Sequence, residues 1–351
     1  MSRLSSMLRY VTLRKPVFMA RAARFYFDTF VRKTTRLRYV DFAINYACNL
    51  ECQHCFATAL HNSPVPGTLS LGEYGDVARQ ARDLGAIHLS LQGGEPTIAP
   101  GLLDIIAAMN PWGVLFSLTT NGTKLSAKLT RDLHRVGVDQ LNVSVDSLEP
   151  CEHDAFRGRA GALASTLAGI ETARRNGLRV QVNCTVSHQN LHSPGFRRVI
   201  GYCGSNHFIL NLVLAAPSGN WTTAEEYLLT PEDMVVVREI IRSKPWVRHD
   251  SDAIRLGHGC PAAREAIYIT PAGEVMACPF IHVSLGNVRR GSLGAILDRA
   301  QATYPFFQGG VSQCLAAQDR GFMDGFMRPL AGRKLPAPHA EVWAGRTWGK
   351  P

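Results

Sequence analysis

No stretch of the 351-residue sequence approaches the roughly 18 uninterrupted apolar residues that a membrane span requires. The 31 glycines and 19 prolines follow no repeating period, which excludes collagen-like and solenoid folds. Hydrophobic residues make up 46% and charged residues 19% of the chain, a balance that excludes a disordered protein and favours a sizeable core. We therefore expect one large domain with an appendage.

Acidic residues are nearly absent from the first 38 residues, where ten Lys and Arg accompany a single acid, Asp28. This segment carries +9 of the total net charge of +10, so the rest of the chain is close to neutral. A nucleic-acid-binding body would need a basic face of its own, so we expect no nucleic-acid partner.

Residues 1–38 are expected to form a basic, aromatic extension that contains a helix, and the helix is expected to start near Pro16. A stripe of arginines beside many aromatic residues is typical of a helix that lies on anionic lipid, which would make the protein peripheral to a membrane. The same aromatic residues would also suit packing against the rest of the protein. An Arg-rich, acid-poor start is also typical of a mitochondrial transit peptide, and the sequence leaves these three explanations open.

The nine cysteines are an odd number, which does not suit a fully disulfide-paired secreted protein. We also expect no signal peptide, because Arg21, Arg24 and Asp28 interrupt the one apolar segment that would serve. The chain is therefore expected in a reducing cytoplasm, where thiols serve metal or redox chemistry.

Short β-branched runs alternate with longer helical runs from residue 38 onward, a pattern that indicates parallel strands with right-handed crossovers. The expected strands are Arg38–Ile44, Ile87–Leu91, Val114–Thr119, Gln140–Val145, Arg179–Val186 and Ile209–Val213. The expected helices are Leu71–Leu84, Leu102–Asn110, Ser126–Val136, Ala162–Asn176 and Pro194–Cys203. Six such units predict an α/β fold, a partial (β/α)6 barrel over residues 39–221.

Beyond the barrel we expect a linker at 222–258, a small domain at 259–320 with a β-hairpin and a helix, and a tail at 321–351 without clear periodicity. The unusual residues of the barrel all follow strand ends. In a parallel barrel these loops open on the same face, where active sites lie, so the sequence predicts one composite site.

Three cysteines, Cys48, Cys52 and Cys55, lie within eight residues after the first strand. The three thiolates of a loop this tight can each ligate one iron of a four-iron cubane cluster, which leaves the fourth iron open for a substrate or cofactor. A zinc site completed by His54, or three ordinary buried thiols, are the alternatives. Zinc sites more often use separated pairs of ligands, so the open cluster is favoured.

This spacing resembles the signature of the radical S-adenosylmethionine (SAM) superfamily, and the resemblance extends over residues ~39–320. It implies a SAM-bound [4Fe–4S] cluster on the three cysteines. Gly93, Gly94, Glu95 and Pro96 look like the family motif that contacts the methionine amino group, with Glu95 as an acceptor for an ammonium.

The same resemblance implies further residues around SAM. Asn121, Ser144 and Asp146 would lie near its ribose and methionine, and Arg157 would pair with the methionine carboxylate as a bidentate fork. His54 and the segment 217–219 would lie near adenine.

Cys260, Cys278 and Cys314 resemble the auxiliary-cluster half domain of the family, called twitch, and imply a second iron–sulfur cluster, expected as [4Fe–4S]. No cysteine follows Cys314, which excludes the full seven-cysteine SPASM form. The second cluster would then have an open iron or an unusual ligand such as Asp319 or His282, and three unrelated buried thiols are the alternative.

Of the remaining cysteines, Cys184 and Cys203 are expected in the core. Cys151 is expected in a loop on the active face, where a thiol would return a hydrogen atom to a substrate radical.

The resemblance predicts an oxidoreductase-type enzyme that cleaves SAM reductively and abstracts hydrogen from a C–H bond of a peptide, carbohydrate or lipid. Oxidation, cross-linking and epimerisation are the outcomes considered, and the expected reductant is a flavodoxin or ferredoxin. The rival hypothesis is a non-catalytic electron-transfer or iron–sulfur carrier protein, which would not need a SAM pocket.

Overall fold

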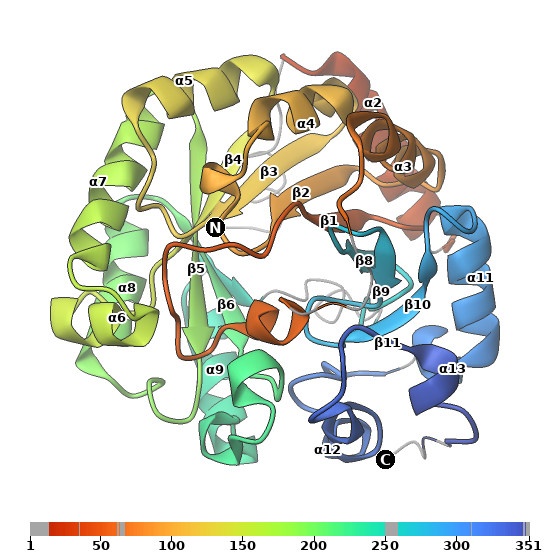
Figure 1. Ribbon diagram of the computed structural model, residues 1–351. Helices are drawn as coiled ribbons and strands as arrows, with labels where there is room; N and C mark the ends of the chain where they lie inside the picture. The colour runs from red at the N-terminus through yellow and green to blue at the C-terminus, as the bar shows by residue number, and fades with distance from the viewer. Residues whose placement is uncertain are drawn as a thin grey trace.

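The computed structural model describes residues 14–34, 36–61, 63, 67–249, 259–309, 311–346 and 348. Its centre is a curved sheet whose outer face is covered by helices (Figure 1). The six predicted strands are present as β1 (Tyr39–Ala43), β2 (His88–Gln92), β3 (Leu115–Thr120), β4 (Gln140–Ser144), β5 (Arg179–Val186) and β6 (Ile209–Leu214). They pair in parallel and in chain order, which confirms the predicted α/β barrel class.

The five predicted barrel helices are also present, with ends close to those expected. They are α3 (Leu71–Asp83), α4 (Leu102–Ala108), α5 (Ala127–Val136), α7 (Ala162–Arg175) and α8 (Pro194–Ser205). Serine caps begin three of them; for example, Ser70 and Glu73 form a capping box at the start of α3. A sixth helix, α6 (Pro150–Arg157), lies where the sequence analysis placed a loop.

The segment 222–258, expected as a linker, contains helix α9 (Pro231–Ser243) and strand β7 (Val247–His249), and residues 250–258 lie outside the described part. Strand β7 pairs in parallel with β6, so this segment extends the barrel by one unit instead of leaving it. The helix begins at a capping box of Thr230 and Asp233, with Pro231 in its first turn. Pro231 and Asp233 thus act as local start signals for this helix.

The C-terminal region belongs to the same sheet as the barrel. Strand β8 (Ala266–Ile269) pairs in parallel with β1 and forms the expected hairpin with β9 (Glu274–Met276). The sheet then continues through β10 (Val283–Asn287) to β11 (Ala337–Pro338), which the tail supplies. Helices α11 (Leu293–Thr303), α12 (Arg320–Phe322) and α13 (His339–Val342) complete this side.

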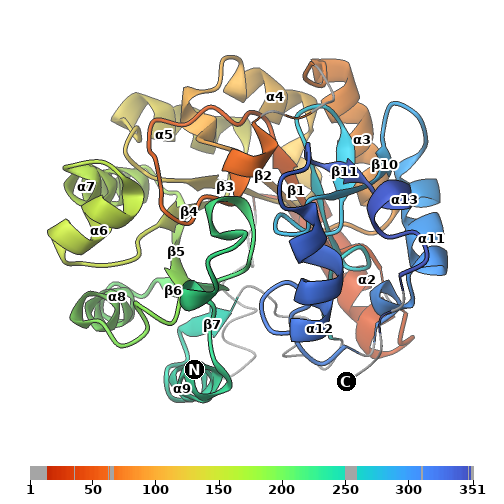
Figure 2. The same ribbon diagram turned by 60° about the horizontal axis from the view of Figure 1, so that its bottom comes forward.

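Helix α2 (Pro16–Phe30) is the described part of the N-terminal extension, and Figure 2 draws it in red. Phe18, Ala22 and Phe25 pack against Ile87 and Leu115, at the amino-terminal ends of β2 and β3. The helix therefore closes the end of the barrel opposite to the loop that follows β1.

The start of α2 is fixed by Lys15, which is buried. Its Nζ donates to the carbonyl oxygens of Pro111, Val114 and Gly137 at 2.7–3.1 Å and to the carboxylate of Asp139 at 2.5 Å. No described helix is both long and apolar enough to span a bilayer.

Candidate active site

The loop with Cys48, Cys52 and Cys55 packs closely against glycines from the loops after β2 and β6 and from the C-terminal end of helix α6. A Cβ on Gly94 would lie 2.2 Å from Ala47 O, one on Gly158 would lie 2.4 Å from Glu51 O, and one on Gly219 would lie 2.0 Å from Cys55 O. Only glycine permits this approach of backbone to backbone. The cysteine loop is therefore fixed from several sides at the carboxyl ends of the strands.

Hydrogen bonds from the same neighbours add to this support. The Glu95 N–H donates to Ala47 O at 2.8 Å, and the Gln53 N–H donates to Phe156 O at 3.0 Å. Asn220, after β6, donates its backbone N–H to Cys55 O at 3.1 Å and its side-chain amide to Cys52 O at 3.0 Å. Loops after β2 and β6 and helix α6 thus all fix the path of the cysteine loop.

All three thiols of this loop line one cavity of about 800 Å³. Partial desolvation raises the pKa of Cys48, which is exposed at the cavity, to about 11, and burial raises the pKa of the half-buried Cys55. Among the described residues, no three His, Cys, Asp or Glu side chains gather as the ligands of a single ion. Thiolates of a four-iron cluster each bind a different iron and need not converge in that way, so the donor set and its open cavity fit such a cluster.

The second set of cysteines lines the same cavity. Cys260 precedes β8, Cys278 follows β9 and Cys314 lies before α12. The Cys260 N–H donates to Val311 O at 2.9 Å, which joins the first of these segments to the third. The structure therefore brings both predicted ligand sets to one cavity, although up to 266 residues separate them in sequence.

The two suggested unusual ligands of the second set differ in their surroundings. The Asp319 N–H donates to Cys314 O at 3.1 Å, and Asp319 Oδ2 is buried without a hydrogen-bond donor among the described residues. His282 already bonds Pro279 O through Nε2 at 3.0 Å. An unpaired buried carboxylate oxygen is costly unless a further group binds it, so the surroundings of Asp319 suit a ligand better.

Two of the residues that resemble the SAM-binding motif differ from the expectation. Glu95 is buried and does not line the cavity. Its carboxylate accepts hydrogen bonds from Thr97 N at 3.0 Å, Thr120 Oγ1 at 2.7 Å and Asn121 N at 2.7 Å. Glu95 thus ties the loop after β2 to the loop after β3, instead of facing an ammonium. Pro96 is buried beside it at the start of a short 3-10 helix, whereas Gly93 and Gly94 line the cavity.

Arg157 also has a different partner from the one expected. Its Nε and Nη2 donate to Asp146 Oδ2 at 2.7 and 2.6 Å, while the Thr185 N–H donates to Asp146 Oδ1 at 2.8 Å. Burial favours the neutral acid, but the Arg157 guanidinium, His54, His153 and the Thr185 N–H together outweigh it and lower the pKa of Asp146. The fork of Arg157 is therefore occupied by a carboxylate of the protein, and its Nη1 lies 3.7 Å from Cys52 Sγ.

The other predicted site residues fall into two groups. Asn121, Ser144, His54 and Ser218 line the cavity. His54 stacks on Phe156 with ring centroids 4.4 Å apart, and burial lowers its pKa to about 3, so the ring is neutral. Cys151 is exposed on α6 and does not line the cavity, because the loop predicted there is a helix.

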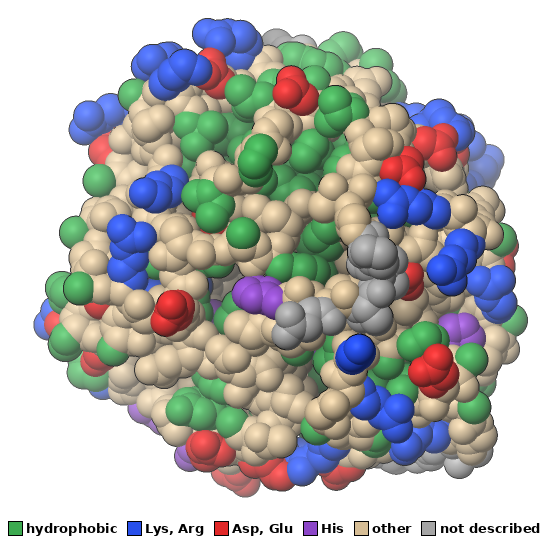
Figure 3. All heavy atoms as spheres, in the orientation of Figure 1, with side chains coloured by type: hydrophobic (Ala, Val, Ile, Leu, Met, Phe, Trp, Pro, Cys, Tyr) green, Lys and Arg blue, Asp and Glu red, His purple; other side chains and the backbone are tan. Residues whose placement is uncertain are grey.

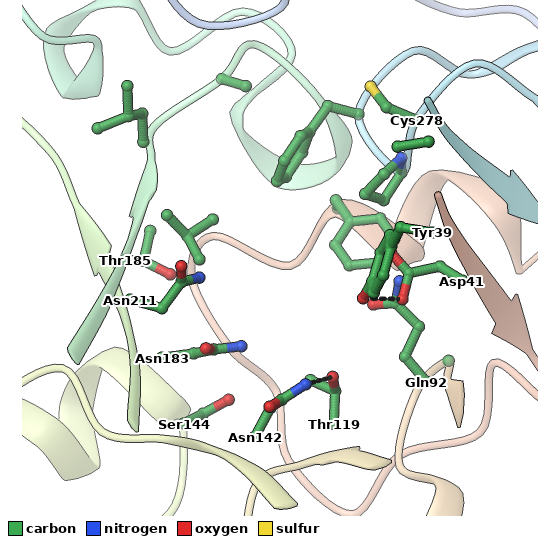
Figure 4. Close-up of a pocket in the computed structure, with 18 of the residues that line it drawn as sticks. Tyr39, Asp41, Gln92, Thr119, Asn142, Ser144, Asn183, Thr185, Asn211 and Cys278 are labelled. Atoms are coloured by element: carbon green, nitrogen blue, oxygen red, sulfur yellow. Dashed lines mark hydrogen bonds between the residues drawn. The ribbon is translucent and has the colours of Figure 1, made fainter. Parts of the chain in front are cut away.

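Most of the polar side chains in the barrel interior were not predicted from the sequence, although Ser144 was. Hydroxyl and amide side chains at alternate positions of neighbouring strands point into this interior (Figure 4). These residues are Gln92, Thr119, Gln140, Asn142, Ser144, Gln181, Asn183, Thr185 and Asn211. The alternation of polar and apolar residues within the strands is a signal that would have revealed them.

These interior side chains bond one another and leave room between them. Gln140 donates to Asn142 Oδ1 at 2.7 Å, and Gln181 donates to Asn183 Oδ1 at 3.0 Å. On the opposite side, the Tyr39 hydroxyl donates to Asp41 Oδ1 at 2.6 Å, and burial raises the pKa of Asp41 to about 7. The arrangement suits a ligand with several hydrogen-bonding groups.

The face that carries this site has few charges near its centre. Figure 3 shows Lys and Arg side chains around its edge, with mostly uncharged side chains in the middle. We therefore expect this face to exert little long-range attraction on a highly charged molecule.

Known proteins resemble this chain in sequence. Residues 43–193 match the Radical SAM superfamily, and residues 260–320 match an iron–sulfur cluster-binding domain named SPASM. The AdoMet-dependent heme synthase of Methanosarcina barkeri is 26% identical over 302 residues, covering 77% of this chain and 85% of that protein. The GTP 3′,8-cyclase of Paracoccus denitrificans is 27% identical over 334 residues, covering 87% and 92%.

Solved structures share the fold. Streptococcus suis SuiB bound to the precursor peptide SuiA gives a TM-score of 0.62 at 15% identity, covering 86% of this chain and 73% of that one. SuiB bound to S-adenosylmethionine gives 0.57 at 14% identity, covering 80% and 67%.

The SPASM match contains only three cysteines, Cys260, Cys278 and Cys314, so the seven-cysteine form is absent from it. The two matched domains imply two cofactor sites: a [4Fe–4S] cluster that binds SAM, and an auxiliary iron–sulfur cluster. The chain belongs to the radical SAM superfamily of enzymes and carries a SPASM-type domain after its radical SAM domain.

Proposed function

We propose that this enzyme abstracts hydrogen from a C–H bond of a polar substrate that binds in the barrel interior, and that the substrate is oxidised or cross-linked. The observation that carries this proposal is the single cavity of about 800 Å³, which both cysteine sets and the polar interior line together. When bound, the SAM-ligated cluster supplies one-electron cleavage of SAM to methionine and a 5′-deoxyadenosyl radical, which takes the hydrogen.

The residues of the chain position the reactants and exclude water. Gly94, Gly158 and Gly219 fix the loop that holds Cys48, Cys52 and Cys55. The amides and hydroxyls of β4, β5 and β6 would orient the substrate so that one C–H bond faces the SAM site, and this positioning is the protein's main contribution to the rate.

The second cysteine set favours net oxidation. A substrate radical that loses a proton also gives up one electron, and a cluster on Cys260, Cys278 and Cys314 would accept that electron at the wall of the same cavity. Epimerisation would instead need a hydrogen donor beside the substrate. Cys151, which the sequence analysis suggested for that role, lies outside the cavity.

The interior also narrows the substrate class. A lipid tail would take the amides of Asn142, Asn183 and Asn211 out of water without adding a hydrogen bond to them, which costs free energy, so a carbohydrate or a peptide is favoured over a lipid. The reductant is proposed to be a flavodoxin or ferredoxin. The names of the relatives point to different substrates (a heme precursor, GTP and a precursor peptide), so no single one is carried over.

The test is anaerobic formation of 5′-deoxyadenosine from SAM and dithionite by the iron-loaded protein, with and without a lipid-free soluble cell extract. We expect formation that the extract increases. Cys52→Ala should abolish it and lower the iron content, because one of three ligands of the SAM-bound cluster is lost. Cys203→Ala is the matched control, since this thiol is buried in α8 and does not line the cavity.

Absence of 5′-deoxyadenosine from fully iron-loaded protein would contradict the proposal. Binding of SAM no tighter than to a control protein would then favour the rival electron carrier. A larger increase with a lipid extract than with the soluble extract would overturn the preference for a polar substrate.

A further inference from the structure

Helix α2 exposes a row of large apolar side chains on the face that points away from the barrel. Val17, Phe27, Phe30 and Val31, at its outer surface and C-terminal end, have 58%, 50%, 42% and 63% of their surface exposed. They are half of the eight large hydrophobic residues that are this exposed in the described part of the chain. Trp112, 43% exposed, lies on the neighbouring segment, where a Cβ on Gly113 would lie 3.8 Å from Val17 Cγ1.

This row is distinct from the face that packs on the barrel. Phe18, Ala22 and Phe25 are the inner face, and Lys15 anchors the start of the helix with four buried contacts. With 3.6 residues per turn, Phe27 and Val31 fall on the opposite side, and Val17 and Phe30 lie on its two flanks. The packing alternative raised by the sequence therefore accounts for one face of the helix, and the other face remains exposed.

The exposed row is bordered by positive charge. The side chains of Arg24 and Arg32 are 75% and 60% exposed, and the Arg32 guanidinium lies 5.4 Å from the centre of the Phe27 ring. Asp28, the one acid of residues 1–38, is buried and lies 2.9–3.9 Å from the guanidinium groups of Arg24, Arg32 and Arg36. The one acid of this segment therefore presents no exposed negative charge beside the apolar row.

We propose that α2 docks the enzyme on an anionic lipid surface, with Phe27 and Val31 in the interface and Arg24 and Arg32 against the headgroups. Apolar burial and attraction to anionic headgroups are the two terms that bind such helices. A nucleic acid would use the arginines but leave the apolar row in water. A second copy of the chain would bring two segments of net charge +9 together.

The proposal is independent of the reaction, and the test is anaerobic flotation of the full-length holoenzyme with vesicles. Vesicles of phosphatidylcholine alone are compared with vesicles that also contain phosphatidylglycerol, at low and high salt. We expect binding to the anionic vesicles only, and a decrease at high salt because exposed charges are screened.

The decisive variant is the double substitution Phe27→Ser and Val31→Ser, which we expect to lower partitioning about tenfold or more. Val235→Ser is the matched control, because Val235 lies on α9 and is also 58% exposed. Neither change touches the cavity, so SAM cleavage without lipid should be unaltered in both, and the melting temperature reports on folding.

Two results would overturn the proposal. The first is equal binding of the double variant and the parent protein, which would show that charge alone attracts the vesicles. The second is no binding to either vesicle together with a dimer in solution that the double variant abolishes, which would assign the row to contact between copies.

Discussion

The surroundings of each sulfur, rather than its place in the sequence, distinguish the nine thiols of this enzyme. Six of them line one cavity with the polar residues of the barrel. Cys184 and Cys203 are buried in the core, where burial raises the pKa of Cys203 to about 12, so neither is a reactive thiolate. Cys151 is the one that the sequence placed wrongly, since it lies exposed on α6 and away from the cavity.

Asp41 gives a prediction at the same scale. Burial raises the pKa of its carboxyl from 3.8 to about 7, with Tyr39, Ser90, Gln92 and Tyr268 as its polar neighbours. Between these two values the unfolded chain has released the proton and the folded protein still holds it. The contribution of the neutral Asp41 carboxyl to the free energy of unfolding is therefore fully present below about pH 4. It is lost as pH rises to about 7, by roughly 4 kcal/mol in all.

Replacing Asp41 by Asn removes this loss. We compare the free energy of unfolding of Asp41→Asn with that of the parent protein at two pH values. We expect the difference to favour the variant by about 2 kcal/mol more at pH 8 than at pH 5.5. Anaerobic thermal unfolding of the holoenzyme at both pH values measures the difference. An equal effect at the two pH values would mean that Asp41 is ionised in the folded protein throughout.

At the scale of elements, the cysteine loop depends on close backbone contact with its neighbours. A Cβ on Gly219 would lie 2.0 Å from Cys55 O and 2.4 Å from Phe56 Cα, so Gly219→Ala must displace the loop. We expect this variant to lose the SAM-bound cluster and fall from about eight irons to about four. Iron analysis together with the 5′-deoxyadenosine assay measures the loss.

Gly161→Ala separates this clash from ordinary backbone strain. Gly161 has φ +75 and Gly219 has φ +59, but a Cβ on Gly161 meets nothing within 4 Å. Its variant should keep its iron and lose about 1 kcal/mol of stability from the strained φ alone. Similar iron loss in both variants would attribute the effect to strain and not to the loop contact.

At the scale of the molecule, the barrel and the SPASM-type region share one sheet. Strand β8 pairs with β1 along four residues, with Ile267 opposite Val40, and both side chains are buried. Neither region therefore has a complete core of its own, and we expect them to unfold together.

Ile267→Ala, a substitution in the SPASM-type region, should destabilise the whole enzyme by about 2–5 kcal/mol through the cavity that it leaves. Far-ultraviolet circular dichroism and the visible absorbance of the clusters should then decrease in one coincident transition at a lower temperature. Two separate transitions, with only the later or earlier one shifted, would show that the regions fold independently.

The sequence by itself determined the elements and indicated the candidate cluster ligands. The β-branched runs and the alternation of strand and helix are local signals, and they predicted six strands and five helices within a few residues. The spacing of Cys48, Cys52 and Cys55 lies within one loop, so it too was visible without a structure. Parallel pairing then required their neighbours to meet at one end of the barrel.

Only the tertiary structure decided which side chains face one another. Arg157 meets Asp146, and Glu95 meets Thr120, because helix packing and strand register bring together residues that are 11 and 25 positions apart. The alternation in β4 and β5 shows that their amides share one face, but only the curved sheet makes that face the interior. Helix α2 divides its aromatic residues between the barrel and the surface for a similar reason. A periodic pattern shows that a helix has an apolar side, but the partner and the exposed remainder depend on long-range contacts.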